Sequence, residues 1–253
     1  MNSERGSPSL LLALRAWWAQ RVPRIGVLKT AREFGAELGE FLLDSTPERR
    51  RQRYGDIDYD WEYRVDTTSA TVNWRDRLLG VFHSPYQPTE PALFREMIDR
   101  LGIDYKRFTF IDLGSGKGRT LLMASEYSFR KIVGVELLPE LHRVAEENVR
   151  KFANDRKTCA AIETLCGDAS EFTFPPEPLV VYLFNPLPEA GLHRTIGNLE
   201  RSLAELPREV WIVYHNPLLE RVLASCPSLR RMGGTPQYAI YASHSIGTAA
   251  VSN

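Results

Sequence analysis

The stretch Phe110-Ile111-Asp112-Leu113-Gly114-Ser115-Gly116-Lys117-Gly118-Arg119-Thr120 decides how this chain folds. An apolar run ends in an acid, three glycines follow at alternate positions, and good helix formers begin at Thr120. This order predicts a buried parallel strand, a tight turn and a helix. In an open α/β sheet such a turn lies outside the carboxyl end of a strand, where ligands bind. Its glycines allow a ligand to approach the backbone closely.

The spacing of the glycines distinguishes two kinds of nucleotide site. Dehydrogenases that bind a nicotinamide dinucleotide carry G-x-G-x-x-G after the first strand. Here the glycines fall at 114, 116 and 118, which makes a dehydrogenase a remote alternative. A second apolar run, from Ile132 to Val135, ends in Glu136. A carboxylate at the tip of that strand can accept hydrogen bonds from both ribose hydroxyls of a bound nucleoside.

The D-x-G-x-G-x-G pattern, followed by this second acid, resembles the cofactor site of class I S-adenosylmethionine methyltransferases. The resemblance implies that S-adenosylmethionine is the cofactor. It implies a ribose contact for Glu136, an adenine-face contact for Leu137, and adenine-ring contacts for Asp168 and the amide of Ala169. On the glycine turn it implies backbone contacts with the methionine part, or a loop-orienting role, for Asp112, Gly114, Ser115, Gly116 and Gly118.

A Tyr-x-Pro-Thr segment lies upstream, before a helix that leads to the glycine turn. This order is similar to a group of small methyltransferases that includes non-SET protein-lysine methyltransferases. In that group the segment closes over the methionine end of the cofactor, which implicates Tyr86 and Thr89. Thr89 also suits the N-cap of the following helix, and a cap and a ligand contact are compatible.

The candidate acceptor element is Asn185-Pro186, at the end of the fourth expected strand. It resembles the N/D-P-P-Y element of enzymes that methylate amines, although positions 187 and 188 are Leu and Pro, so the second proline and the aromatic residue are missing. Asn185 can still accept a hydrogen bond from an attacking amine. Because methyl transfer is an in-line displacement, alignment and charge placement do most of the work.

An oxygen acceptor would require a base. His215, at the end of the fifth expected strand, is the first candidate, and His83 is the second. Either histidine is more often structural or exposed. The leading hypothesis is therefore methyl transfer to an amine, on protein lysine or another N-acceptor. The alternatives are a small-molecule O-methyltransferase and a non-catalytic module that binds S-adenosylmethionine and acts by contact.

Strands alternate with helices from residue 107 onward, which predicts an α/β fold with a doubly wound, mostly parallel seven-stranded sheet. A closing hairpin after the fifth strand resembles the antiparallel last strand of the class I fold. Strands are expected at about 107–112, 131–136, 161–166, 179–184 and 209–214, then near 228–232 and 237–243, with Gly233 to Pro236 as the turn between the last two. Helices are expected at about 92–101, 117–128, 138–153 and 189–206, with a short one ending near 226.

Residues 1–82 are predicted to form a helical and aromatic appendage, 83–245 the methyltransferase domain, and 246–253 a flexible tail. Residues 10–44 are expected to be helical, basic and aromatic, and either pack on the catalytic domain or contact a membrane surface or a protein partner. Residues 56–63 alternate acids with aromatics. They are expected to form either an ordered loop, with Trp61 and Tyr63 lining an acceptor pocket, or an N-terminal cover.

The composition narrows the class of protein. The chain has 253 residues, 43% of them hydrophobic, and its 32 basic and 32 acidic residues balance, so a basic footprint for nucleic acid is absent at whole-chain level. No window is long and apolar enough to predict a membrane span. Three cysteines form neither a disulfide framework nor a zinc spacing, so no metal site and a cytoplasmic location are expected.

Overall fold

The computed structural model describes residues 15, 18–19, 21–24, 26–43, 57–68 and 88–244. The chain divides into two compact units, one of Met1–Glu62 with Thr68–Pro88, the other of Tyr63–Thr67 with Thr89–Asn253. The predictions for Tyr86, His83 and the tail 246–253 lie outside the described residues. The domain boundary at residue 83 stays a prediction, although residues 63–67 group with the sheet.

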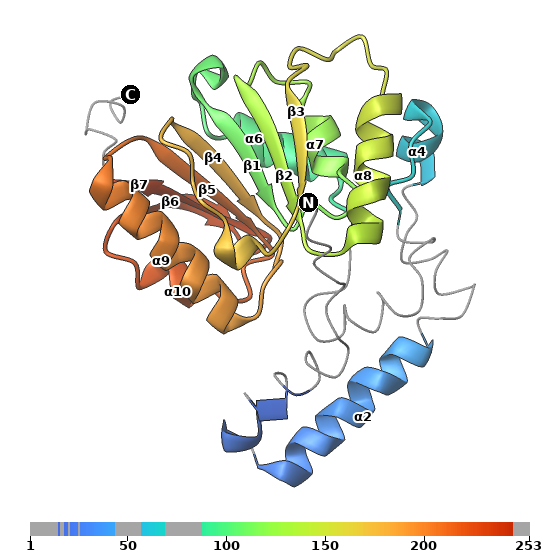
Figure 1. Ribbon diagram of the computed structural model, residues 1–253, viewed down its shortest axis with the longest axis vertical. Coiled ribbons are helices and arrows are strands. Elements are labelled where there is room, and N and C mark those ends of the chain that lie inside the picture. Colours follow the sequence, from blue (N-terminus) through green and yellow to red (C-terminus); the bar gives the residue numbers. More distant parts are fainter. Residues whose placement is uncertain are drawn as a thin grey trace, which may run out of the picture. The chain divides into compact units, whose positions relative to one another are not determined.

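A seven-stranded sheet forms the larger unit, in the order β3-β2-β1-β4-β5-β7-β6 (Figure 1). The first five strands in this order are parallel, and β7 pairs antiparallel with both of its neighbours. The strands are β1 Thr109–Leu113, β2 Lys131–Glu136, β3 Ile162–Cys166, β4 Leu179–Leu183, β5 Val210–His215, β6 Leu229–Thr235 and β7 Tyr238–Ser243. The predicted doubly wound α/β fold, with its closing antiparallel strand, is confirmed.

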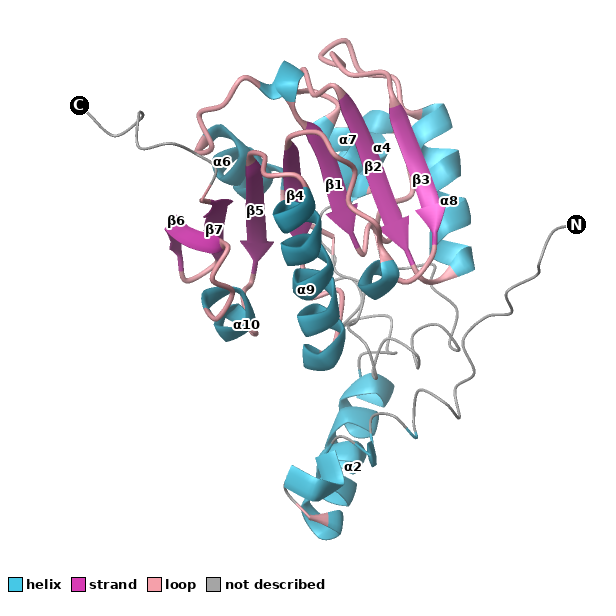
Figure 2. Ribbon diagram, turned by 60° about the vertical axis from the view of Figure 1, so that its left-hand side comes forward, coloured by secondary structure: helices cyan, strands magenta, loops and turns pink. Residues whose placement is uncertain are grey.

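Helices cover both faces of this sheet. Figure 2 shows α9 and α10 in front of it and α6, α7 and α8 behind it. Their bounds are α6 Pro91–Asp99, α7 Arg119–Ala124, α8 Pro139–Lys151, α9 Glu189–Glu205 and α10 Glu220–Ala224, with short 3-10 turns η2 Tyr105–Arg107 and η3 Ala169–Glu171. Every residue of β1 and β4 is buried, as expected of parallel strands covered on both faces.

Alternate residues of the central strands serve two separate cores. Ile111 and Leu113 of β1 belong to the apolar cluster that also holds the α9 residues Leu192, Ile196 and Leu199. Phe110 points the other way and joins a cluster of rings in which Phe94 of α6 lies 6.0 Å away, centroid to centroid. The same alternation places Asp112 on the α6 face, because side chains in a strand point to opposite faces with a period of two.

Two local predictions were wrong. The helix after the glycine turn ends at Ala124, not near 128, because a tight turn follows in which Ser125 Oγ donates to the Leu122 carbonyl. Gly233 and Gly234 belong to β6 rather than to the turn, and a bulge lies between Arg231 and Gly233. Only glycine fits at position 234, since its φ is +142° and a Cβ would lie 2.2 Å from the Tyr238 carbonyl oxygen.

The smaller unit is described in two parts. Helix α2 spans Val27–Leu43, within the region 10–44 that was expected to be helical. Gly26, just before it, has a left-handed φ of +81°. Residues 57–63, expected as a loop or a cover, form the helix α4 Ile57–Tyr63. The side chain of Asp60 accepts a hydrogen bond from the Thr68 amide at 2.9 Å, which fixes the chain just after this helix.

Candidate functional site

The glycine turn is pressed against the candidate acceptor element. The amides of Gly114 and Ser115 both donate to the Val135 carbonyl, at 2.8 and 3.0 Å, so the turn wraps over the end of β2. Gly114 has a φ of +89°, and a Cβ at this position would lie 2.4 Å from Cβ of Pro186. The predicted cofactor turn and the predicted acceptor element therefore share one van der Waals contact at the carboxyl edge of the sheet.

Glu136 ends β2 and is held by backbone amides. Its Oε2 accepts from the Gly116 amide and its Oε1 from the Leu138 amide, both at 2.8 Å. The residue is 7% exposed, and this burial raises the pKa of the carboxyl group, against the lowering effect of the amide donors. A carboxylate offers about four lone-pair sites, so two donors leave acceptor capacity for hydroxyl groups. Leu137 follows it, half-buried.

Asp112 is buried at the end of β1. Thr120 Oγ1 of α7 donates a hydrogen bond to its Oδ2. Burial raises the pKa of Asp112 to about 7, with a further rise from the charge of Glu136 and an opposing effect of the Thr120 hydrogen bond. The contact ties the strand before the glycine turn to the helix after it. The loop-orienting or cofactor-contacting role of Asp112 stays a prediction.

Asp168 and Ala169 lie beyond the tip of β3. The Asp168 side chain accepts from the Ser170 amide at 2.7 Å and caps η3, while Ala169 is buried. The amide of Gly167 donates to the Glu136 carbonyl at 2.9 Å, so the tips of β2 and β3 are tied together. The two predicted nucleoside acids thus follow neighbouring strands at one edge of the sheet.

Thr89 and His215 are joined through a residue that the sequence reasoning missed. The Tyr182 hydroxyl lies 2.9 Å from Thr89 Oγ1 and 2.7 Å from His215 Nδ1. Thr89 does not cap the following helix, whose N-cap is Glu90. His215 also stacks on Phe184, with ring centroids 3.9 Å apart. The only sequence signal for Tyr182 was one hydroxyl within an apolar strand.

Burial lowers the pKa of His215 to about 4. At neutral pH the ring is therefore uncharged, and an imidazole with so low a pKa is a weak general base. This property bears on the choice between oxygen and nitrogen acceptors.

The buried His215 is also expected to make stability depend on pH. Its folded pKa lies below the usual 6.5, so the unfolded chain binds the proton first and stability falls as pH drops from 6.5 toward 4. Between pH 7.5 and 5 the loss is about 2 kcal/mol. Asp112, with its raised pKa, acts in the opposite direction. We therefore expect the free energy of unfolding in urea to differ less between the wild type and His215→Gln at pH 5 than at pH 7.5, by about 2 kcal/mol. A difference that does not change with pH would contradict this.

Asn185 is held in one orientation. Its φ of +47° is left-handed. The Tyr214 hydroxyl donates to Asn185 Oδ1 at 2.8 Å, and Asn185 Nδ2 donates to the Asn216 carbonyl at 2.6 Å. Both partners lie at or just beyond the end of β5, the strand that pairs with β4. The side-chain amide at the acceptor element is thus fixed from the neighbouring strand.

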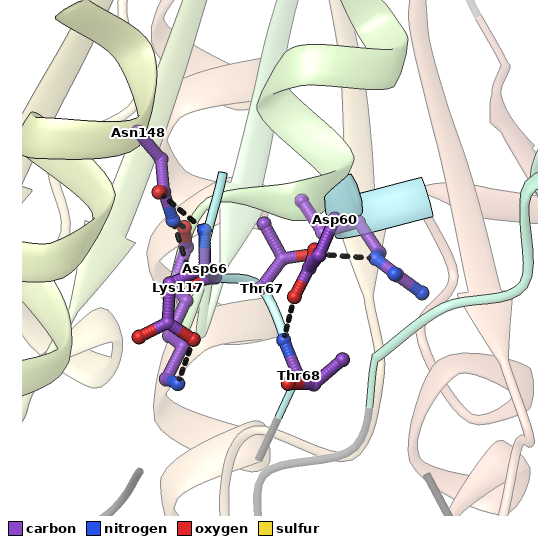
Figure 3. A network of polar contacts seen from close by, with 7 residues as sticks. Asp60, Asp66, Thr67, Thr68, Lys117 and Asn148 are labelled. Atoms are coloured by element: carbon purple, nitrogen blue, oxygen red, sulfur yellow. Dashed lines mark hydrogen bonds and ion pairs between the residues drawn. The ribbon is translucent and has the colours of Figure 1, made fainter. Parts of the chain in front are cut away.

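A polar network joins Asp66 and Thr67 to the glycine turn (Figure 3). Lys117 Nζ lies 2.7 Å from Asp66 Oδ1, and its side chain is only 1% exposed. Asn148 of α8 donates to the carbonyls of Asp66 and Lys117. Arg119 Nε donates to Thr67 Oγ1 at 2.7 Å. No role was predicted for Lys117 or Arg119 from the sequence. Two cationic side chains within a glycine turn are the signal that could have indicated one.

Within the part of the chain that the structure describes, no helix is both long enough and apolar enough to cross a membrane. Trp61 of α4 is 85% exposed, and the Tyr63 ring lies 5.2 Å from that of Phe152. The suggested pocket-lining role of these two aromatics stays a prediction.

The chain is similar to several known methyltransferases. A family model described as "Histone methylation protein DOT1" matches residues 82–161. No curated protein matches the chain. Among solved structures, a putative methyltransferase YhhF from Escherichia coli is similar, with 18% identity over 63% of this chain and 89% of that one and a TM-score of 0.46.

Two further structures of this kind are a ribosomal protein L11 methylase from Lactobacillus delbrueckii subsp. bulgaricus and an RNA methyltransferase from Salinibacter ruber in complex with S-adenosyl-L-homocysteine. The first has 19% identity, coverage of 59% of this chain and 75% of that one, and a TM-score of 0.43. The second has 20% identity, coverage of 62% and 92%, and a TM-score of 0.41. At these values the likeness says nothing about what this chain methylates.

The strand order, with its single antiparallel strand inserted before the last one, is that of the class I methyltransferase fold. The family model covers the glycine turn and the acid that ends β2. This chain therefore has the fold of the class I S-adenosylmethionine-dependent methyltransferases.

Proposed function

We propose that this chain is a methyltransferase that binds S-adenosylmethionine at the tips of β1, β2 and β3 and methylates an uncharged amine beside Asn185. The acceptor is a protein lysine or another amine. The observation that carries the proposal is the fixed side-chain amide of Asn185, which lies next to the glycine turn through the contact between Gly114 and Pro186.

The residues present fit the cofactor. Glu136 keeps acceptor capacity for ribose hydroxyls, and Asp168 stands one strand away, where an adenine amino group needs an acceptor. Gly114, Ser115, Gly116 and Gly118 give the close backbone approach that a methionine tail requires, and Leu137 supplies an apolar surface for the base. S-adenosylmethionine, when bound, supplies an electrophilic methyl group.

The low pKa of His215 and the hydrogen-bond acceptor of Asn185 favour an amine over an oxygen acceptor. A hydroxyl acceptor needs a base, and burial leaves His215 a weak one with Nδ1 engaged by Tyr182. An uncharged amine already carries a lone pair and needs only alignment. Asn185 Oδ1 can accept one N–H and so aim that lone pair along the line of attack.

The test is Asn185→Ala in the full chain. We expect calorimetry to give an S-adenosylmethionine affinity within about twofold of wild type, while methyl transfer falls about 100-fold, the usual scale for losing one preorganised polar contact. Transfer is measured as tritiated methyl incorporated into lysate of a deletion strain, sorted into protein, RNA and small molecules. Asn154→Ala is the matched control, since Asn154 bonds Glu126 in a loop away from the site.

The outcomes separate the competing functions. Label in protein or amine metabolites that disappears with Asn185→Ala supports the proposal. Label in hydroxyl groups of small molecules supports the O-methyltransferase. Cofactor binding without any labelled acceptor from the wild type supports a non-catalytic module that acts by contact, for which residues 10–44 remain the expected surface.

A further inference from the structure

The hydrogen bonds around Tyr214 determine which atom of the Asn185 amide faces which partner. The Leu219 amide donates to the Tyr214 hydroxyl at 3.3 Å. The hydroxyl proton therefore goes to its other neighbour, Asn185 Oδ1, at 2.8 Å. Tyr214 is 1% exposed and burial raises its pKa, so the hydroxyl keeps this proton at neutral pH. Asn185 Oδ1 must then be the acceptor of this contact.

The other end of the amide agrees with this assignment. Asn185 Nδ2 lies 2.6 Å from the Asn216 carbonyl, which can only accept. Asn185 and Asn216 both adopt left-handed φ values, +47° and +48°, which bring the ends of β4 and β5 together. One lone pair of Oδ1 and one proton of Nδ2 remain after these two bonds.

We propose that Tyr214 is the positioning residue of the acceptor site, which orients Asn185 so that its remaining Oδ1 lone pair receives an N–H of an uncharged amine. This inference rests on the proposed amine specificity. An aspartate at position 185 would place a carboxylate oxygen against the Asn216 carbonyl, so the arrangement selects an amide. The two hydrogen-bond partners of the Tyr214 hydroxyl described above are protein atoms, so in this proposal Tyr214 acts through Asn185.

The experiment uses two cofactor analogues in which nitrogen replaces the sulfonium. One carries an aminoethyl arm in place of the methyl group, and the other carries a propyl arm of equal length without the amine. The ratio of their dissociation constants in calorimetry isolates the amine contact. We expect the wild type to bind the amine analogue about tenfold more tightly, as one well-placed hydrogen bond allows. Tyr214→Phe should reduce this ratio to within about threefold of one.

Three controls make the result specific. The propyl analogue should bind Tyr214→Phe as it binds wild type, because the cofactor turn is untouched. Tyr241→Phe, which removes another buried hydroxyl from the sheet, one bonded to Glu220 at 3.0 Å, should keep the wild-type ratio. Placing 4-aminophenylalanine at position 214 restores a donor and should restore the ratio. If the Phe variant loses its fold, 4-methylphenylalanine at that position fills the space without a donor and replaces it in the test.

The outcomes distinguish this inference from the proposed function. A tenfold ratio in wild type that persists in Tyr214→Phe overturns the role of Tyr214 and leaves the amine acceptor standing. A ratio near one in wild type, with both analogues bound, overturns the amine acceptor and this inference with it. Loss of the ratio in Tyr241→Phe as well would show a general structural effect and overturn the specific role.

Discussion

Gly114→Ala is expected to destabilise the protein by about 4 kcal/mol, the sum of left-handed strain and overpacking, each of about 1–3 kcal/mol. The φ of Gly114, +89°, disfavours any side chain at this position. The new Cβ would also lie 2.4 Å from Cβ of Pro186, an atom of the stiff proline ring. Relief requires Pro186 to move, and Asn185 precedes it. We therefore expect methyl transfer to fall further than cofactor affinity, with a thermal midpoint lowered by about 10 °C.

Gly102→Ala is the matched control for this substitution. Gly102 also has a left-handed φ, +60°, but a Cβ there would meet nothing within 4 Å. It should therefore show the strain alone, about 1 kcal/mol and a few degrees in the thermal midpoint. Equal midpoints for the two variants would mean that the contact between the cofactor turn and the acceptor element contributes nothing.

The sequence predicted which acidic side chains meet at one edge of the sheet, because local patterns mark the ends of the strands. Each of Asp112, Glu136 and Asp168 follows an apolar run, and parallel strands bring such ends to one edge. The structure places all three at the expected strand tips. A close contact between distant turns, such as Gly114 with Pro186, has no local signature, although the glycine itself marked a place where the backbone is approached.

Other features depend on pairing across the fold and could not be predicted from one sequence. In the sequence, Tyr214 is one more residue of the apolar strand β5. Its hydroxyl can reach Asn185 only because the strand register pairs Tyr214 with Leu183, two residues before Asn185. From the sequence, residues 63–67 are expected to be part of the appendage. In the structure, the buried side chains of Lys117 and Arg119 bond to Asp66 and Thr67, which no local pattern predicts.

Asp66→Ala is expected to destabilise the larger unit by about 2 kcal/mol, the scale for losing a hydrogen bond to a charged group. The Lys117 side chain is 1% exposed, and Asp66 Oδ1 lies 2.7 Å from its Nζ. Asp66 itself is 44% exposed, which places the effect at the low end of that scale. Because Lys117 lies between Gly116 and Gly118, cofactor affinity in calorimetry should fall about tenfold along with the free energy of unfolding in urea.

Glu163→Ala provides the matched control, since it removes the carboxylate that pairs with Lys131, a lysine of the same sheet. Lys131 Nζ lies 2.5 Å from Glu163 Oε2, but both side chains are about half exposed, at 44% and 46%. Water can hydrate the remaining ammonium, so the cost should be at most about 1 kcal/mol, with cofactor affinity unchanged. Similar losses in the two variants would show that burial of Lys117 adds nothing. A stable Asp66→Ala protein with normal affinity would support the predicted boundary near residue 83, with residues 63–67 as part of the appendage.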